Sequence, residues 1–215
     1  MEREDVAPIS KMKIRKIQHT GEYEMKFITL LGSARKKGNT ATVLGWVEAE
    51  LEALGHTVER VTLHRKSIKG CMGCAKCHES PDEIACVQKD DAIEIMEKMI
   101  AADGTLYASP IYFWGFSAQT KALIDRSYSL VTRYHQPGHT SLMSGKRVGL
   151  LITGADAYQD NAEGIFTAFD RIVDFLLARK CGELYVGECS VPKKLSDEIR
   201  SNAVELARKL AGEQS

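Results

Sequence analysis

The segment Gly32-Ser33-Ala34-Arg35-Lys36-Lys37-Gly38-Asn39-Thr40 decides the fold, because it joins a buried strand to a helix. Residues 25–31 (MKFITLL) before it are largely apolar, and residues 40–54 after it carry apolar side chains at helical spacing and stop at Gly55. Small residues in such a connection let backbone N–H groups approach an anion, and the helix N-terminus adds partial positive charge. The segment therefore predicts a phosphate-binding loop.

The spacing within this loop separates it from other phosphate-binding loops. Five residues lie between its two glycines and Asn39 follows, whereas a Walker A loop has four, followed by Lys and Ser or Thr. The Rossmann pattern G-x-G-x-x-G is absent too. Ser33 and Thr40 supply short polar donors, and Arg35 supplies a planar cation. Taken alone, the pattern fits an ordinary turn between a strand and a helix equally well.

Strands and helices alternate along the rest of the chain, which indicates an α/β fold. Five strands that alternate with five helices predict a doubly wound, five-stranded parallel sheet with helices on both faces. The other strands are expected at residues 57–63, 105–108, 147–153 and 183–186, and the other helices at residues 90–100, 117–130, 162–179 and 196–210.

Two more loops are expected at the same edge of the sheet as the phosphate loop. Residues 109–117 (SPIYFWGFS) follow the third strand and contain four aromatic side chains, and residues 153–157 (TGADA) follow the fourth strand. A loop with rings and backbone donors suits a flat heteroaromatic ligand. The four rings cannot all be buried within one chain, so we also expect a homodimer or homotetramer.

Three segments resemble a known family. Residues 32–40, residues 109–112 (SPIY) and residues 121–126 (KALIDR) are similar to the NADPH-dependent FMN reductase branch of flavodoxin-like proteins, and most similar to its iron-sulfur flavoprotein subgroup. The resemblance spans about residues 25–190 and implies a flavodoxin-like fold with strand order 2-1-3-4-5 and FMN at the switch point of the sheet. It implies contacts with the FMN phosphate from Ser33, Arg35, Gly38, Asn39 and Thr40, and contacts with the isoalloxazine from Pro110, Ile111, Tyr112, Phe113, Trp114, Thr153 and Gly154. Lys121, Asp125 and Arg126 are interpreted as structural residues in subunit contacts.

Four of the six cysteines lie within sixteen residues. Cys71, Cys74 and Cys77 have C-x2-C-x2-C spacing, and Cys86 follows after eight further residues, a slightly longer gap than is usual in the subgroup. Three thiolates at this spacing can surround one corner of a 4Fe–4S cubane, and the fourth can close it. We expect these four to ligate such a cluster. Zinc, with His78 as a substitute ligand, disulfides and free thiols remain alternatives.

The composition restricts the classes of partner. With 29 basic and 29 acidic residues the chain has no net charge, which disfavours nucleic acid as a partner. No apolar run approaches the roughly 20 residues of a membrane-spanning helix. The N-terminus lacks the order of a secretory signal. We therefore expect a cytoplasmic protein that binds neither nucleic acid nor membrane.

Domain organisation is expected to be simple. Residues 1–24 are predicted to be a polar N-terminal extension, and residues 25–215 a flavodoxin-like FMN-binding domain with a cysteine-cluster insertion at about residues 68–90. Cys181 and Cys189 lie outside that insertion and are expected to be buried as small hydrophobic residues.

The leading functional interpretation is an FMN-dependent oxidoreductase that couples FMN to a 4Fe–4S cluster and so connects two-electron and one-electron donors. NAD(P)H or a ferredoxin-like protein is the expected electron donor or acceptor, and no catalytic side chain is expected, because the chemistry belongs to the cofactors. Three alternatives remain: an NAD(P)H:acceptor FMN reductase without a cluster, a flavin-dependent substrate dehydrogenase, and a non-catalytic redox sensor.

Overall fold

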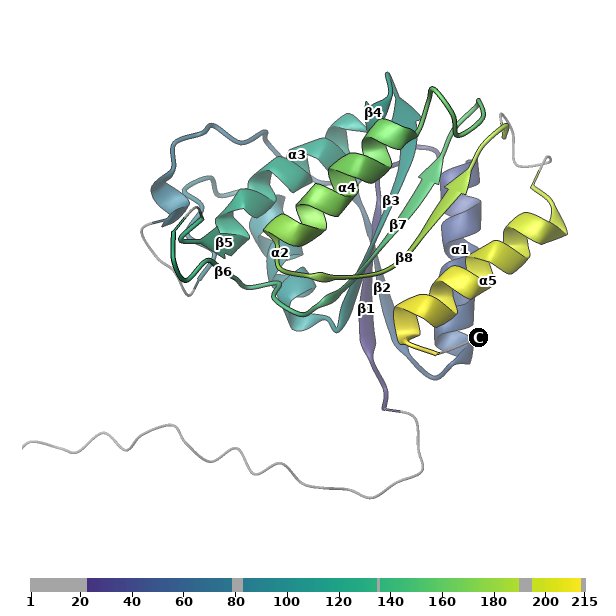
Figure 1. Ribbon diagram of the computed structural model, residues 1–215, viewed down its shortest axis with the longest axis horizontal. Helices are drawn as coiled ribbons and strands as arrows, with labels where there is room; N and C mark the ends of the chain where they lie inside the picture. The colour runs from purple at the N-terminus through teal and green to yellow at the C-terminus, as the bar shows by residue number, and fades with distance from the viewer. Residues whose placement is uncertain (1–22, 79–82, 135, 190–194, 214–215) are drawn as a thin grey trace, which may run out of the picture.

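A parallel β-sheet forms the centre of the molecule in the computed structural model, which describes residues 23–78, 83–134, 136–189 and 195–213. Its five parallel strands are β1 (Lys26–Leu31), β2 (Thr57–Thr62), β3 (Gly104–Tyr112), β7 (Arg147–Thr153) and β8 (Arg179–Val186). They are ordered β2-β1-β3-β7-β8 (Figure 1). Numbered by their sequence among the parallel strands, this is 2-1-3-4-5, so the predicted fold class and strand order are confirmed.

Helices cover both faces of the sheet (Figure 1). One face packs against α1 (Asn39–Ala53) and α5 (Asp197–Ala211), and the other against α2 (Asp91–Ala101), α3 (Ala118–Arg126) and α4 (Glu163–Phe175). Successive side chains of β1 point to opposite faces of the sheet. Phe27 therefore packs into the core beneath α1 and α5, and Ile28 packs into the core beneath α2, α3 and α4. The described residues also contain three short 3-10 helices: η1 (Leu63–Arg65), η2 (Lys76–His78) and η3 (Ser127–Leu130).

The segment 109–117, predicted as a loop, is instead a strand extension with a tight hairpin. β3 continues to Tyr112, and the chain returns as β4 (Gly115–Phe116), which pairs antiparallel with the end of β3. The two turn residues, Phe113 and Trp114, have φ values of 47° and 56°. A two-residue hairpin turn with both residues in the left-handed region is normally signalled by Asn-Gly, and Phe-Trp gives no such signal.

Two smaller differences concern the second half of the chain. A hairpin of β5 (Val131–Thr132) and β6 (Thr140–Ser141) was not predicted. The helix predicted to reach residue 179 ends at Phe175, because Leu177 has a φ of 50° and Arg179 already begins β8. The other expected elements are present with ends shifted by a few residues.

The parallel sheet brings the segments that follow β1, β3 and β7 to one edge. Because β1, β3 and β7 run in the same direction, residues after Leu31, Tyr112 and Thr153 emerge at their shared carboxyl edge. The predicted extension at residues 1–24 lies outside the described residues except for its last two. Within the part of the chain that the structure describes, no helix combines the length and hydropathy needed to cross a membrane.

Candidate cofactor sites

The phosphate loop begins at Gly32, which lies directly against the first turn of α3. Its N–H group donates to the carbonyl oxygen of Ala108 in β3 at 2.8 Å. A Cβ at this position would lie 2.0 Å from Oγ1 of Thr120 and 2.7 Å from Oγ of Ser117. These two hydroxyls are buried and lie 3.0 Å apart, within hydrogen-bonding distance. Glycine is therefore required where the loop meets α3.

The loop then leads into the N-terminus of α1. The N-cap residue, Gly38, has an extended backbone and no side chain that could cap the helix, so the N–H groups of the first turn can bind an anion. Internal bonds hold the loop: the N–H of Gly38 donates to the carbonyl of Arg35, and the N–H of Arg35 donates to Oγ of Ser33. The guanidinium of Arg35 makes no ion pair with the described residues, so its charge is available to a ligand.

Asn39 and Thr40 connect the start of α1 to the ends of two distant strands. Nδ2 of Asn39 donates to the carbonyl oxygen of Cys189, and the hydroxyls of Thr40 and Thr153 lie 2.7 Å apart. Oδ1 of Asn39 is buried and has no hydrogen-bond donor among the described residues. Since buried acceptors are normally satisfied, this oxygen fits a donor on a bound molecule.

These residues line a cavity of about 510 Å³ at the carboxyl edge of the sheet. Cofactor sites commonly measure about 300–1,000 Å³. Ten of the twelve expected FMN-contacting residues line this cavity: Ser33, Arg35, Gly38, Asn39, Thr40, Pro110, Ile111, Tyr112, Thr153 and Gly154. Charge, hydroxyls and small residues thus gather where a phosphate would lie, with Ile111 and Tyr112 on the strand end beside them.

The remaining two, Phe113 and Trp114, do not line this cavity. They form the tip of the β3–β4 hairpin, where their side chains are 95% and 65% exposed. Their rings contact each other edge to face, with centroids 6.2 Å apart. The structure therefore places these rings on the surface beside the cavity.

Three lining residues were not singled out from the sequence: Lys37, Ala155 and Cys189. The first two belong to loops that the sequence did identify. Cys189 follows β8 and reaches the site only through the fold. Its buried thiol donates to the carbonyl of Val186 at 3.2 Å, and burial raises its pKa, so it remains a neutral packing group. This matches the expectation for Cys189, whereas Cys181 is only partly buried.

The four clustered cysteines line a second cavity, of about 290 Å³, in the segment between β2 and α2. Cys71 and Cys74 are exposed, Cys77 is buried and Cys86 is intermediate. Gly73 and Ala75, with φ values of 65° and 57°, turn the chain between successive thiols. His78 does not line this cavity; its ring packs edge-on against Tyr128.

The thiols are close enough to affect one another electrostatically. Burial raises the pKa of the Cys77 thiol, and the nearby Cys86, Cys71 and Cys74 raise it further, because neighbouring thiolates would repel. Four thiolates here would need a cationic partner. No group of three His, Cys, Asp or Glu residues within the described ranges is arranged to hold a metal ion. The four cysteine sulfurs that line the cavity are the type of donor that ligates a 4Fe–4S cluster, although their positions here are not those of a closed metal site.

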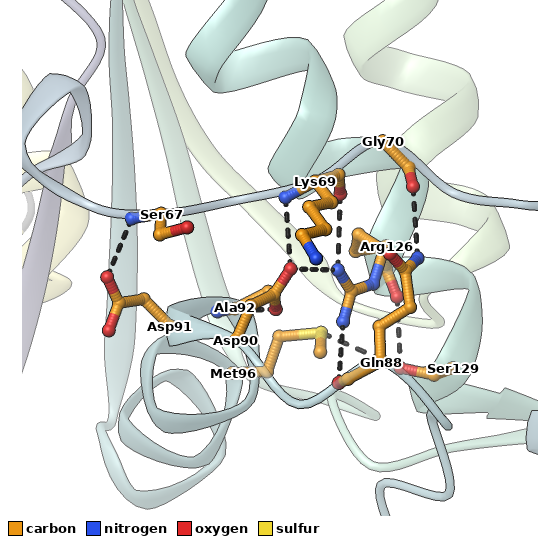
Figure 2. Close-up of polar contacts among 10 residues, drawn as sticks. All are labelled: Ser67, Lys69, Gly70, Gln88, Asp90, Asp91, Ala92, Met96, Arg126 and Ser129. Carbon is orange, nitrogen blue, oxygen red and sulfur yellow. Dashed lines mark hydrogen bonds and ion pairs between the residues drawn. The ribbon is translucent and has the colours of Figure 1, made fainter.

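Arg126, the last residue of α3, fastens the cysteine segment at its base (Figure 2). Its Nη1 donates to Oδ2 of Asp90 at 2.7 Å and to the carbonyl oxygen of Lys69 at 3.1 Å, and its Nη2 donates to the carbonyl oxygen of Gln88 at 3.2 Å. Its side chain is fully buried. The prediction that Arg126 lies in a subunit contact is therefore wrong, because the guanidinium is enclosed within its own chain.

The acidic pair at the start of α2 closes the same segment. Asp90 is the N-cap and accepts from the N–H groups of Ala92 and Lys69, while Asp91 accepts from the N–H of Ser67 at 2.7 Å (Figure 2). Burial opposes ionisation of Asp90, but the hydrogen bonds from Arg126 and the two backbone donors outweigh it and lower its pKa. Asp90 is thus a charged structural residue.

Comparison with known proteins identifies the family. The family model described as NADPH-dependent FMN reductase matches residues 25–173. The chain belongs to this family. Membership in the FMN reductase family makes it a flavin-dependent oxidoreductase, and the relatives below place it in the iron-sulfur flavoprotein subgroup.

Two curated relatives and one solved structure illustrate the similarity. An iron-sulfur flavoprotein of Archaeoglobus fulgidus is 31% identical over 187 residues, which cover 87% of this chain and 79% of that protein. One of Methanocaldococcus jannaschii is 41% identical over 106 residues, covering 49% of this chain and 53% of that protein, so the match spans about half the length of that relative. The NAD(P)H:quinone oxidoreductase of Methanothermobacter marburgensis has a TM-score of 0.65 at 18% identity, covering 88% of this chain and 98% of its own. That last similarity shows the shared fold.

Proposed function

We propose that this FMN reductase family member binds one FMN per chain in the cavity at the carboxyl edge of the sheet. The phosphate would lie on residues 32–40, where the free N–H groups of α1 and the unpaired guanidinium of Arg35 meet. The buried Oδ1 of Asn39 would accept from a ribityl hydroxyl. The isoalloxazine would lie against Ile111, Tyr112 and the backbone at Gly154.

Close packing around Gly154 holds the backbone at the end of the cavity where the isoalloxazine would lie. A Cβ at Gly154 would lie 2.5 Å from the hydroxyl of Tyr185 and 3.3 Å from Cδ1 of Ile111. That hydroxyl is itself held by Asn161 Nδ2 at 2.8 Å and by the carbonyl of Asp156 at 2.7 Å. The loop after β7 therefore presents its backbone to the ligand in one conformation, which suits a planar ring.

We further propose that Cys71, Cys74, Cys77 and Cys86 hold a 4Fe–4S cluster. When bound, FMN can exchange two electrons as hydride or one electron at a time, and the cluster exchanges one, so the pair would connect the two kinds of donor. The chain would contribute the four thiolates, the cavity that they line and the hydrogen bonds at the base of the cysteine segment. The proposed location is the cytoplasm, whose reducing conditions keep such thiols free.

The observation that carries this proposal is the convergence of ten expected residues on one cavity from three separate segments of the chain. The test is to purify the protein anaerobically and identify the flavin released on denaturation. FMN at about one per chain is expected. Arg35→Ala and Asn39→Ala should each weaken FMN binding at least about tenfold with little change in unfolding, since these side chains would bind the charged and polar parts of the ligand.

Lys36→Ala is the matched control, because Lys36 is a neighbouring exposed cation that does not line the cavity. It should leave FMN affinity within about twofold of the unmodified protein. Release of FAD, or unchanged FMN affinity in both the Arg35 and Asn39 variants, contradicts the proposed site.

A second candidate is an NAD(P)H:acceptor reductase that uses FMN alone. It is favoured by the exposure of Cys71 and Cys74. Under this alternative, NAD(P)H oxidation with a quinone acceptor would proceed equally fast in a Cys71→Ser variant, and neither protein would contain iron. Under the leading proposal, iron is present and is lost in the variant.

The proposed electron donor or acceptor is NAD(P)H or a ferredoxin-like protein. The proposed assembly is a homodimer or homotetramer of this chain. Tyr112, Phe113 and Trp114 form a contiguous exposed aromatic surface at the hairpin. Surfaces of this kind mark contacts with other molecules. A homodimer or homotetramer would cover these rings beside the FMN cavity, and light scattering of the FMN-bound protein tests the mass.

A further inference from the structure

Hydrogen bonds tie together the two ends of the cysteine segment. The first end, at Ser67 and Lys69, donates its N–H groups to Asp91 Oδ2 at 2.7 Å and to Asp90 Oδ2 at 3.0 Å. The N–H of Asp91 donates in return to the carbonyl of Ser67 at 3.1 Å. Nε2 of Gln88 donates to the carbonyl of Gly70 at 3.0 Å (Figure 2). The cysteines thus belong to a loop closed at its base.

Arg126 reaches into this base from a different part of the chain. Its two terminal nitrogens span both ends of the segment, since they bind the carbonyl of Lys69 on one side and the carbonyl of Gln88 and the carboxylate of Asp90 on the other. We call these contacts among Arg126, Lys69, Gln88 and Asp90 the Arg126 clasp. A planar guanidinium with several fixed donors can join three acceptors at once, which an ammonium cannot do with the same geometry.

The Nε nitrogen of Arg126 takes no part in the clasp. Nε is buried and has no acceptor among the described residues, although both terminal nitrogens have theirs. The same side chain lines the cavity formed by the four thiols. A buried N–H without a partner is rare in a protein interior, so an acceptor on a group bound in the cavity would account for it.

Cysteine sulfurs are acceptors that the cavity offers, beside the side-chain oxygens of Gln88, Tyr128 and Ser129. Cys86 lies two residues before Gln88 of the clasp and lines the cavity with Arg126. An arginine side chain keeps its proton in proteins, and the carboxylate of Asp90 accepts from Nη1 of this one at 2.7 Å. The guanidinium is therefore permanently charged beside a ligand sulfur.

We propose that Arg126 is a positioning residue for the iron-sulfur cluster, in which the clasp holds the thiols around the cavity and Nε–H donates to a sulfur of the bound cluster. This inference rests on the proposed cluster at Cys71, Cys74, Cys77 and Cys86. Outer hydrogen bonds to metal ligands commonly change metal affinity by about 10- to 100-fold when they are removed. Hydrogen bonds to cluster sulfurs also set the reduction potential.

The sign of the effect on potential follows from charge. Reduction adds one negative charge to a cluster that is already anionic with four thiolates, so a nearby cation and N–H donor stabilise the reduced form more than the oxidised form. Removing them should move the cluster's midpoint potential to a more negative value. A residue that only supports the fold would not shift the potential of a cluster that is still bound.

The FMN cavity provides an internal reference for folding. Thr120, which supports the phosphate loop, lies in the first turn of α3, six residues or about 9 Å along the helix from Arg126. A change confined to the clasp should leave that end of α3 and FMN affinity intact. Loss of FMN together with the cluster would indicate general disruption instead.

The test compares Arg126→Lys and Arg126→Gln with the unmodified holoprotein, all purified anaerobically with FMN. Arg60→Lys and Arg60→Gln are the matched controls, because Arg60 also binds a carboxylate, that of Glu48, through two nitrogens but away from the cysteines. The measurements are iron per FMN, the rate of iron loss to a chelator, the midpoint potential of the cluster, and, in metal-free protein, hydrogen exchange of the N–H groups of Lys69 and Asp91.

Both Arg126 variants should lose iron at least about tenfold faster, shift the potential to more negative values and exchange those two N–H groups faster, with FMN affinity unchanged. Arg126→Lys, which keeps the charge, should fall between Arg126→Gln and the unmodified protein. The Arg60 variants should match the unmodified protein in all four measurements.

Iron retention and potential equal to those of the unmodified protein in both variants would overturn the inference while leaving the proposed cluster in place. If the unmodified protein itself holds no iron, the proposed function fails, and the inference fails with it. If both variants lose FMN and the folded state, Arg126 is a general structural residue and the inference is wrong.

Discussion

Replacing Gly32 with alanine should disturb both the fold and the phosphate loop. The added Cβ would lie 2.0 Å from Oγ1 of Thr120 and 2.7 Å from Oγ of Ser117, whereas ordinary van der Waals contact begins at 3.4 Å. The loop or α3 must therefore move by more than 1 Å, and the two hydroxyls are buried and hydrogen-bonded to each other, so neither can turn away freely. Overpacking of this kind costs about 1–3 kcal/mol of unfolding free energy.

A double-mutant cycle tests whether that specific contact is the cause. Thr120→Ala alone should cost about 1 kcal/mol, because it removes a hydrogen bond to Ser117 and a little packing. Combined with Gly32→Ala it opens space for the new methyl group, so the double variant should be more stable than the sum of the single effects by about 1 kcal/mol or more. Gly164→Ala is the control, since a Cβ there meets nothing within 4 Å and alanine favours a helix.

The assay is urea unfolding of the flavin-free protein together with FMN titration by flavin fluorescence. Gly32→Ala should lower both the unfolding midpoint and FMN affinity, and Gly164→Ala should lower neither. A Gly32→Ala protein with unchanged midpoint and affinity, or strictly additive effects with Thr120→Ala, would refute the argued contact between the loop and α3.

Three further predictions follow from the same geometry. The pKa of Asp90 is lowered in the folded state, so its carboxylate stabilises the protein fully above its usual pKa of 3.8 and less as pH falls through the folded value. The difference in urea midpoint between the unmodified protein and Asp90→Asn should therefore become smaller below about pH 4. A difference that grows below about pH 4 would refute this prediction. Trp114→Ser should lower the mass measured by light scattering at micromolar concentration, and an unmodified protein that is already monomeric with FMN bound contradicts the assembly. Cys86→Ser should lose iron but keep FMN, whereas Cys181→Ser should keep both; full iron in Cys86→Ser means that the fourth ligand lies elsewhere.

The strands and helices were predictable because each carries its own periodicity, whereas their order in the sheet followed from the resemblance to flavodoxin-like proteins. β7 spans the predicted residues 147–153, and the other parallel strands differ from their predicted bounds mainly at their ends. The hairpin at Phe113 and Trp114 was not predictable in this way. Its turn places two large aromatic residues in the left-handed region, where sequence signals anticipate glycine or asparagine. The pairing of Ile111 with Phe116 and of Tyr112 with Gly115 fixes it.

The candidate FMN site was largely predictable because its residues occupy local motifs at strand ends. Cys189 was not, since it joins the cavity from 35 residues beyond Gly154 and is placed there by the pairing of β7 and β8. The Arg126 clasp is likewise non-local, because Lys69 precedes Arg126 by 57 residues. Long-range contacts between a side chain and backbone carbonyls leave no periodic signal in the sequence.

The central claim is that one chain holds both FMN and a cysteine-ligated cluster. The most direct test is the visible absorption spectrum of anaerobically purified protein, combined with iron, zinc, sulfide and flavin analysis of the same sample. The account predicts a broad shoulder beside the flavin bands and about four iron and four sulfide per FMN. A flavin spectrum without that shoulder, with zinc or no metal in the sample, would contradict it.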